Sequence, residues 1–338
     1  AFNADTGDEI FGYIPSWLRT KLSALTNTNY NANHKSYMDG SPAIGEAEVD
    51  SDWKTVLVSG TGAGGQGVFA LDVSDPDSFG PSKVLWEFTD RDDVDLGNVI
   101  GRPQILKFRT SAPSASPVVY KWFAVVPSGV NNNAADGHFS TTGKPALFLL
   151  DLSKSAAAAW QENVNYYKIS LPAGDATKPT GLANFAATEG YAGEVSTIYF
   201  GDLQGSVWTL NFASQGTADW NLDKLSAFKS STSPYPAVPF YIAKDSAGTV
   251  QPITGSPALS RGPNGSVLVL IGTGKYLETA DNAVTASTQV QSMYVLMDNG
   301  SSTIAARSSL QGGAVNTSTG AIAVPSFIWG TKFGWYID

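Results

Sequence analysis

The chain has no cysteine and only two histidines among its 338 residues. Disulfide bonds and thiolate metal sites are therefore excluded, and a zinc site would lack most of its usual ligands. His34 and His138 lie in no recognisable motif with Ser or Asp, and there is no Gly-x-Ser-x-Gly element. No run of about 18 apolar residues occurs, so no membrane span is expected. These absences predict a protein that is not an enzyme and has no cofactor.

Charged residues are also scarce, at 15% of the chain, and they give a net charge of −9 without any cluster of Lys or Arg. Nucleic acid and anionic lipid bind through basic patches, so the sequence disfavours both as partners. The missing cysteine fits an extracytoplasmic protein. Because the chain begins inside what looks like a repeat, we expect a fragment of a larger protein.

Glycine and proline are abundant instead, at 34 and 18 residues, and they separate short apolar runs. A Gly-x-Pro element followed by an aliphatic residue occurs three times, at 40–44, 101–105 and 255–259. Proline belongs at the start or edge of a strand, so each copy predicts a strand after a turn. The apolar strands expected next are Trp53–Gly60, Trp122–Gly129 and Ser266–Gly272, and then Gly67–Asp72, Ala146–Asp151 and Ser292–Asp298.

A fourth module without the Gly-x-Pro element supplies Thr197–Asp202 and Ser206–Asn211. More amphipathic strands are expected at Lys83–Phe88, Tyr166–Leu171 and Glu9–Ile14. Four strands per module, apolar inside and half polar outside, are typical of a propeller blade. The sequence thus predicts an all-β chain whose residues 1–338 form a single β-propeller domain with long inserted loops. A β-sandwich is the alternative.

One helix is expected, over Pro15–Leu25, with Ser16 as its cap. Gly62–Gly67 fits Gly-x-Gly-x-x-Gly, but a dinucleotide site needs a strand before it and a helix after it. Strands are expected on both sides, so we interpret these glycines as a hairpin with positive φ angles.

An acidic loop offers the clearest oxygen ligands in the sequence. Asp90, Asp92 and Asp95 alternate in a way that suits calcium, but the glycine and bidentate glutamate of an EF-hand are missing. Solvated acidic turns explain the same pattern. The three aspartates are therefore weak calcium candidates.

Taken together, these segments resemble the C-terminal propeller of the PilY/PilC family of type IV pilus tip proteins. The matching stretches are 2–10, 37–42, 53–76, 84–105, 199–212, 253–259, 272–278 and 334–338. The resemblance implies a seven-bladed ring, and it implies that the N-terminal half of the full protein is absent from this chain. It also implies an adhesin at the cell surface, outer membrane or pilus tip of a Gram-negative bacterium. Such proteins promote pilus assembly and extension, with roles in twitching motility, virulence and attachment to host cells.

Partners follow from the same resemblance: minor pilins and other pilus components, host-cell or matrix receptors, and the N-terminal half of the same protein. Many relatives carry an Asp-x-Asp-x-Asp-x-x-x-Asp calcium loop before the strand that leads to Gly201. In this chain the four ligand positions hold Thr188, Gly190, Ala192 and Ser196. Calcium control by that loop is therefore not expected, although a site elsewhere stays open.

Two other functions stay open. Residues 201–208 resemble the tryptophan-docking element of quinone-dependent (PQQ-type) oxidoreductase propellers, although a turn at Asp202 and Gly205 with a packed Trp208 would explain them equally. A carboxylate pair across a propeller channel would permit glycoside hydrolysis. A purely structural scaffold is a third interpretation. If the chain binds partners, we expect its inserted loops to do so, with Asn131, Asn132, Asn133, Asp136 and His138 as candidates.

Overall fold

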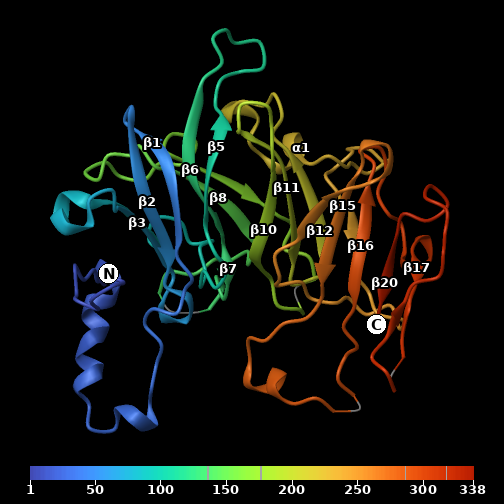
Figure 1. The fold of residues 1–338 in the computed structure, drawn as a ribbon, viewed down its shortest axis with the longest axis horizontal. Coiled ribbons are helices and arrows are strands. Elements are labelled where there is room, and N and C mark those ends of the chain that lie inside the picture. Colours follow the sequence, from blue (N-terminus) through green and yellow to red (C-terminus); the bar gives the residue numbers. More distant parts are fainter. Residues whose placement is uncertain (135–136, 176, 286, 317) are drawn as a thin grey trace. The chain divides into compact units, whose positions relative to one another are not determined.

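Antiparallel sheets dominate the computed structural model, which describes residues 1–134, 137–175, 177–285, 287–316 and 318–338 (Figure 1). Within these residues, four sheets are meanders of strands that mostly follow one another along the chain. The first two contain β1 (Ala43–Val49), β2 (Asp52–Gly60), β3 (Gly67–Asp72) and β4 (Val84–Thr89), then β5 (Gln104–Arg109), β6 (Tyr120–Pro127), β8 (Ala146–Asp151) and β9 (Tyr166–Ser170). The other two contain β10 (Gly181–Glu189), β11 (Val195–Asp202), β12 (Ser206–Asn211) and β13 (Tyr241–Ile242), then β14 (Ala258–Arg261), β15 (Val267–Gly272), β16 (Met293–Asp298), β20 (Gly334–Ile337) and β17 (Gln311–Gly312).

The remaining elements are short. They are β7 (Gly129–Val130), the hairpin of β18 (Ala314–Val315) and β19 (Ile322–Ala323), and the helix α1 (Leu222–Leu225). The 3₁₀ helices are Ser16–Thr26, Tyr30–Ala32, Gly62–Gly64, Pro76–Ser78, Pro81–Lys83, Thr217–Asp219, Pro263–Gly265, Thr279–Asn282 and Arg307–Ser309. No helix of the described residues is long and apolar enough to cross a membrane.

The strand order follows the predicted repeat. β1, β5 and β14 each begin directly after the proline of a Gly-x-Pro element, because proline ends a turn but cannot donate to the ladder. β3 and β8 are buried along their whole length, whereas β4 alternates between buried and half-buried side chains. The inner strands are therefore apolar on both faces and the outer strand is amphipathic, as predicted for a blade.

Two local predictions near the start of the chain are wrong. Residues Glu9–Ile14 form no strand; an isolated bridge joins Phe2 to Glu9, and side chains hold the rest. The Phe11 ring stacks on Phe79 with centroids 3.9 Å apart, so ring packing replaces a hydrogen-bond ladder. The predicted helix forms as a 3₁₀ helix, but Ser16 does not cap it. Its amide donates to Glu87 Oε1 at 2.7 Å and its hydroxyl donates to Glu87 Oε2.

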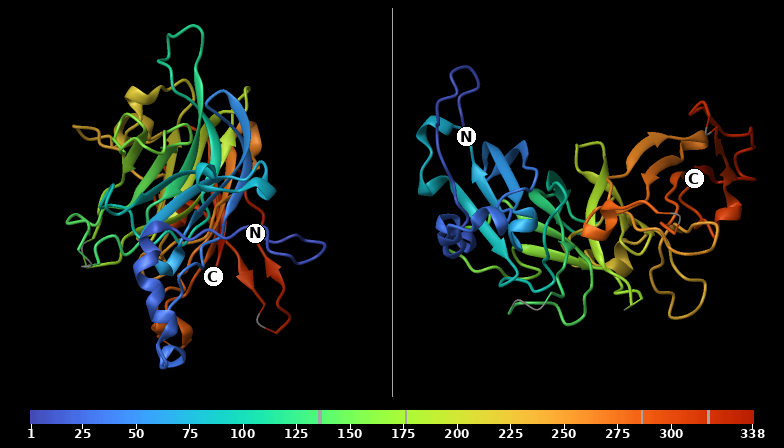
Figure 2. Two further views of the ribbon diagram at one scale, coloured as in Figure 1. Left: turned by 90° about the vertical axis from the view of Figure 1, so that its left-hand side faces the viewer. Right: turned by 90° about the horizontal axis from the view of Figure 1, so that it is seen from below.

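The chain divides into two compact units. Unit 1 comprises Ala1–Pro172 with Ser214–Trp220, and unit 2 comprises Ala173–Ala213 with Asn221–Asp338. In unit 1 the core lies between the sheets β1–β4 and β5–β9, where Phe88 and Phe148 meet with ring centroids 5.5 Å apart. In unit 2 the core joins β11–β12 to β15–β16. Within each unit the two sheets stand side by side (Figure 2).

Candidate functional site

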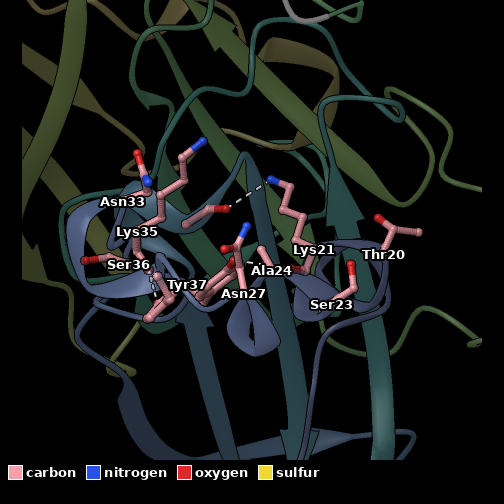
Figure 3. A pocket seen from close by; sticks show the side chains of 11 residues that line it. Thr20, Lys21, Ser23, Ala24, Asn27, Asn33, Lys35, Ser36 and Tyr37 are labelled. Carbon is pink, nitrogen blue, oxygen red and sulfur yellow. Dashed lines mark hydrogen bonds between the residues drawn. The ribbon is translucent and has the colours of Figure 1, made fainter.

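The segment before β1 forms a cavity against the first sheet, and this cavity is the candidate binding site (Figure 3). Its walls come from the 3₁₀ helices Ser16–Thr26 and Tyr30–Ala32 and the residues that lead on to Tyr37. The cavity has a volume of about 480 Å³, which is in the range of small-molecule sites. Its lining residues are Thr20, Lys21, Ser23, Ala24, Asn27, Tyr30, Asn33, Lys35, Ser36, Tyr37 and Gly64.

The glycine-rich loop Gly62–Gly67 provides the platform for this segment. It joins β2 to β3 as a hairpin with φ +59° at Gly62, which confirms the prediction of a turn. A Cβ atom at Gly64 would lie 1.9 Å from the carbonyl oxygen of Tyr37, and one at Gly67 would lie 2.4 Å from the Trp17 ring. The glycines are thus required both for the turn and for the close approach of the segment that builds the cavity.

Two lysines define the charge of the cavity. Lys21 Nζ donates to the carbonyl oxygen of Gly64 at 3.1 Å. Among the described residues that line the cavity, Lys21 and Lys35 are the ionised groups, and no aspartate or glutamate accompanies them. Figure 3 shows the side chains of Lys21 and Lys35 both extending toward the top of the view. Most of the other lining residues carry a hydroxyl or amide group beside apolar carbon surface, so the cavity suits an anionic ligand that has both hydroxyl groups and C–H faces.

Gly67→Ala is expected to loosen the cavity, because the new methyl group would collide with the indole of Trp17. Overpacking of this kind destabilises by about 1–3 kcal/mol. We expect faster cleavage within residues 16–37 in limited proteolysis, with the first sheet intact. Gly80→Ala is the matched control, since a Cβ at that extended residue meets no atom within 4 Å. Equal cleavage rates for both variants would contradict the proposed contact.

The loop predicted to bind partners, which contains Asn131 to His138, is partly buried. Asn132 is buried, and its amide group donates to the carbonyl oxygens of Asp95 and Lys144 at 3.2 and 2.9 Å. Asn131, Asn133 and His138 are exposed, whereas Asp136 lies outside the described residues. Asn132 therefore supports the framework, and the binding role of the exposed members of this loop stays a prediction.

The acidic loop is organised around a lysine that sequence reasoning did not single out. Lys168 Nζ on β9 lies 2.8 Å from Asp93 Oδ2 and 3.1 Å from Asp95 Oδ2. The Tyr166 hydroxyl also donates to Asp93, at 3.0 Å. Burial alone would lower the pKa of Lys168, but the hydrogen bonds and charges of both carboxylates outweigh it and raise that pKa. A protein ammonium group therefore neutralises Asp95.

The other two calcium candidates lie elsewhere in this loop. Asp92 Oδ2 accepts the amide hydrogen of Thr89 at 2.8 Å, and the amide of Asp90 donates to the carbonyl oxygen of Gln66 at 3.2 Å. In the parts of the chain that the structure describes, no group of three or more His, Asp and Glu side chains is arranged to hold a metal ion. Asp90, Asp92 and Asp95 stay weak calcium candidates.

The four positions of the relatives' calcium loop lie at the hairpin between β10 and β11. Thr188 and Ser196 belong to these strands, and Gly190 and Ala192 form the turn. The turn is closed by protein groups: the Gly190 amide donates to the Glu194 carbonyl oxygen at 2.6 Å, and the Ala192 amide donates to Glu194 Oε2 at 2.8 Å. Glu194 thus closes this turn through its main-chain carbonyl oxygen and its carboxylate.

An aspartate ends one strand in each of the four sheets, and these aspartates have the same structural role. One oxygen of each carboxylate accepts the amide hydrogen two residues later; the aspartates are Asp72, Asp151, Asp202 and Asp298. At Asp202 the second oxygen accepts the indole hydrogen of Trp208 at 3.2 Å. Burial raises the pKa of Asp202. The quinoprotein-like element is therefore explained by a turn and a packed tryptophan.

Antiparallel meander sheets that share a core with a neighbouring sheet in each unit are typical of a β-propeller protein. The family model described as the PilY1 beta-propeller domain matches residues 3–322. The chain belongs to this family. The described residues provide four blade-like sheets, and the seven-bladed ring stays a prediction.

Relatives agree with this assignment. A type IV pilus biogenesis factor PilY1 homolog of Xylella fastidiosa is 30% identical over 99% of this chain and 21% of its own length. The type IV pilus biogenesis factor PilY1 of Pseudomonas aeruginosa strain UCBPP-PA14 is 31% identical over 88% of this chain and 24% of its own length. The crystal structure of the P. aeruginosa PilY1 C-terminal domain aligns with a TM-score of 0.73 at 27% identity, covering all of this chain and 67% of that domain. The chain thus spans about a fifth to a quarter of these two full-length relatives.

Proposed function

We propose that this chain is the propeller of a type IV pilus biogenesis factor that promotes pilus assembly and extension and attaches cells to host surfaces. The match of residues 3–322 to the PilY1 beta-propeller family carries the proposal. The names of the relatives support the assembly role. The propeller would act by binding, without catalysis and without a cofactor, at the cell surface or pilus tip.

Rigid blades with exposed inserted loops support a binding role, because ligand contacts commonly lie on loops held by a stable scaffold. We propose minor pilins and the N-terminal half of the same protein as assembly partners. Host-cell or matrix receptors would be the partners in attachment. The exposed residues Asn131, Asn133 and His138 remain one candidate contact surface. The basic cavity before β1 is a second, structurally separate candidate.

Deletion of the full-length gene tests the assembly role. We expect a strain without it to show few surface pili by electron microscopy and weak adherence to host cells. Complementation with the full-length gene should restore both, whereas a gene lacking the codons for residues 1–338 should not. Normal pilus numbers and normal adherence in the deletion strain would refute the proposal. Restoration by the shortened gene would refute the part assigned to this propeller.

A further inference from the structure

We propose that the cavity before β1 binds an anionic sugar, that is, a sugar ring carrying a carboxylate or sulfate group, within an extracellular polysaccharide. This inference deepens the attachment part of the proposed function and rests on that part alone. It assigns the site to the segment between the 3₁₀ helix Ser16–Thr26 and Tyr37, closed by Gly64.

Local charge is the first argument. The chain as a whole carries a net charge of −9, yet the ionised groups of the described lining are Lys21 and Lys35. Within the described part of the chain, the Lys35 ammonium group has no hydrogen-bond or ion-pair partner, and Lys21 donates only to the carbonyl oxygen of Gly64. Two ammonium groups without a carboxylate create a positive potential that would attract an anion against the overall charge of the chain.

Preorganisation is the second argument. The Tyr37 hydroxyl donates to the carbonyl oxygen of Lys21 at 3.1 Å, and the Tyr30 hydroxyl donates to the carbonyl oxygen of Lys35 at 3.2 Å. Each lysine therefore has its main chain held by a tyrosine from another part of the cavity. Fixing these positions before the ligand arrives reduces the entropy lost on binding.

The lining chemistry favours a sugar among the anions. Thr20, Ser23 and Ser36 supply hydroxyl groups, and Asn27 and Asn33 supply amides that can both donate to and accept from ring hydroxyls. The rings of Tyr30 and Tyr37 offer apolar surface with a polar edge, which suits the C–H faces of a sugar. A volume of about 480 Å³ admits a ring with its substituents. A peptide carboxylate would leave most of these hydroxyl and amide groups without a ligand partner.

Titration calorimetry with the full 338-residue chain tests the inference. The probes are tetragalacturonate for carboxylate sugars, a heparin tetrasaccharide for sulfated sugars, neutral maltotetraose and a hexaglutamate peptide. We expect at least one anionic saccharide to bind at low salt, with affinity that falls as salt screens the charges. Maltotetraose and hexaglutamate should bind at least about tenfold more weakly. Maltotetraose lacks an acidic group, and hexaglutamate lacks the sugar hydroxyl groups. The anionic saccharide that binds more tightly shows whether the site prefers a carboxylate sugar or a sulfated sugar.

Variants locate the site. Lys21→Gln combined with Lys35→Gln should weaken saccharide binding about tenfold or more, since two charge-assisted contacts are lost. Lys224→Gln removes one positive charge from an exposed residue of α1, outside the cavity, and should leave binding unchanged. Tyr37→Phe keeps both charges but frees the Lys21 main chain, and we expect about a threefold loss. Thermal denaturation confirms that each variant is folded.

The inference is overturned if neither anionic saccharide binds, if the neutral saccharide or the peptide binds equally well, or if the double lysine variant binds like Lys224→Gln. Failure here would not affect the assembly role, because the pilus count of the deletion strain does not depend on saccharide binding. Conversely, a deletion strain with normal pili would leave the saccharide result intact.

Discussion

Replacement of Lys168 by methionine is expected to lower the free energy of unfolding of unit 1 by about 3–5 kcal/mol. The Lys168 side chain is 16% exposed, and its partners Asp93 and Asp95 are 4% and 12% exposed. Without the ammonium group, two neighbouring carboxylates would remain buried with no opposite charge beside them. Such uncompensated burial is more destabilising than loss of the attraction alone. Urea denaturation followed by far-UV circular dichroism measures the change.

Lys178→Met is the control for this variant, because Lys178 and Asp175 form an exposed pair with 39% and 48% of their side chains accessible. We expect it to change the free energy of unfolding by at most about 1 kcal/mol. Similar small losses for both variants would contradict the structural role of Lys168.

The pH dependence of the Lys168 contribution has a defined sign. The pKa of Lys168 is raised in the folded state, so protonated Lys168 stabilises the fold fully below the ordinary lysine pKa of about 10.4. This contribution is lost as the pH rises through the higher folded-state pKa. The difference between wild type and Lys168→Met should therefore be constant near neutral pH and shrink in strongly alkaline solution.

Trp220→Ala is expected to destabilise unit 1 by about 3–5 kcal/mol. Trp220 is 3% exposed and belongs to the segment Ser214–Trp220, which joins unit 1 from a distant part of the sequence. Its ring lies 5.4 Å from Phe108, 5.4 Å from Phe123 and 4.8 Å from Tyr167, centroid to centroid. Removal of the indole would leave a cavity among three aromatic rings that cannot collapse together.

Trp53→Ala tests whether any tryptophan of unit 1 would have the same effect. Trp53 is 65% exposed and contacts the edge of the Trp122 ring at a centroid distance of 5.8 Å. We expect Trp53→Ala to lower the free energy of unfolding by at most about 1 kcal/mol, because this pair is exposed. Urea denaturation by far-UV circular dichroism avoids the change in tryptophan fluorescence that both variants share. A loss at Trp53 equal to that at Trp220 would refute the cavity argument.

Local chemistry made much of the propeller predictable. Proline cannot donate to a strand ladder, so Pro42, Pro103 and Pro257 mark the residues after which β1, β5 and β14 begin. The fully apolar runs that become β3 and β8 have few alternatives to burial between two sheets. The strand-end aspartates were visible as a pattern because an aspartate can bond to the amide two residues later.

Segments held by distant side chains were not predictable in the same way. Glu9–Ile14 has the alternation of a strand, yet stacking of Phe11 on Phe79 decides its path. Ser16 has the chemistry of a helix cap, yet Glu87, 71 residues away in the sequence, provides its partner. The local sequence predicts neither contact, because Phe79 and Glu87 belong to another part of the chain.

The candidate cavity also combines a locally determined turn with contacts that only the tertiary structure sets. The sequence by itself determined that Gly62–Gly67 is a turn, since its glycines permit positive φ and strands lie on both sides. Only the tertiary structure decided that Trp17 and Tyr37 would approach these glycines and that Lys21 and Lys35 would share a cavity without a carboxylate. Turn formation depends on the backbone preferences of adjacent residues. The charge and shape of a site depend on which distant side chains packing brings together.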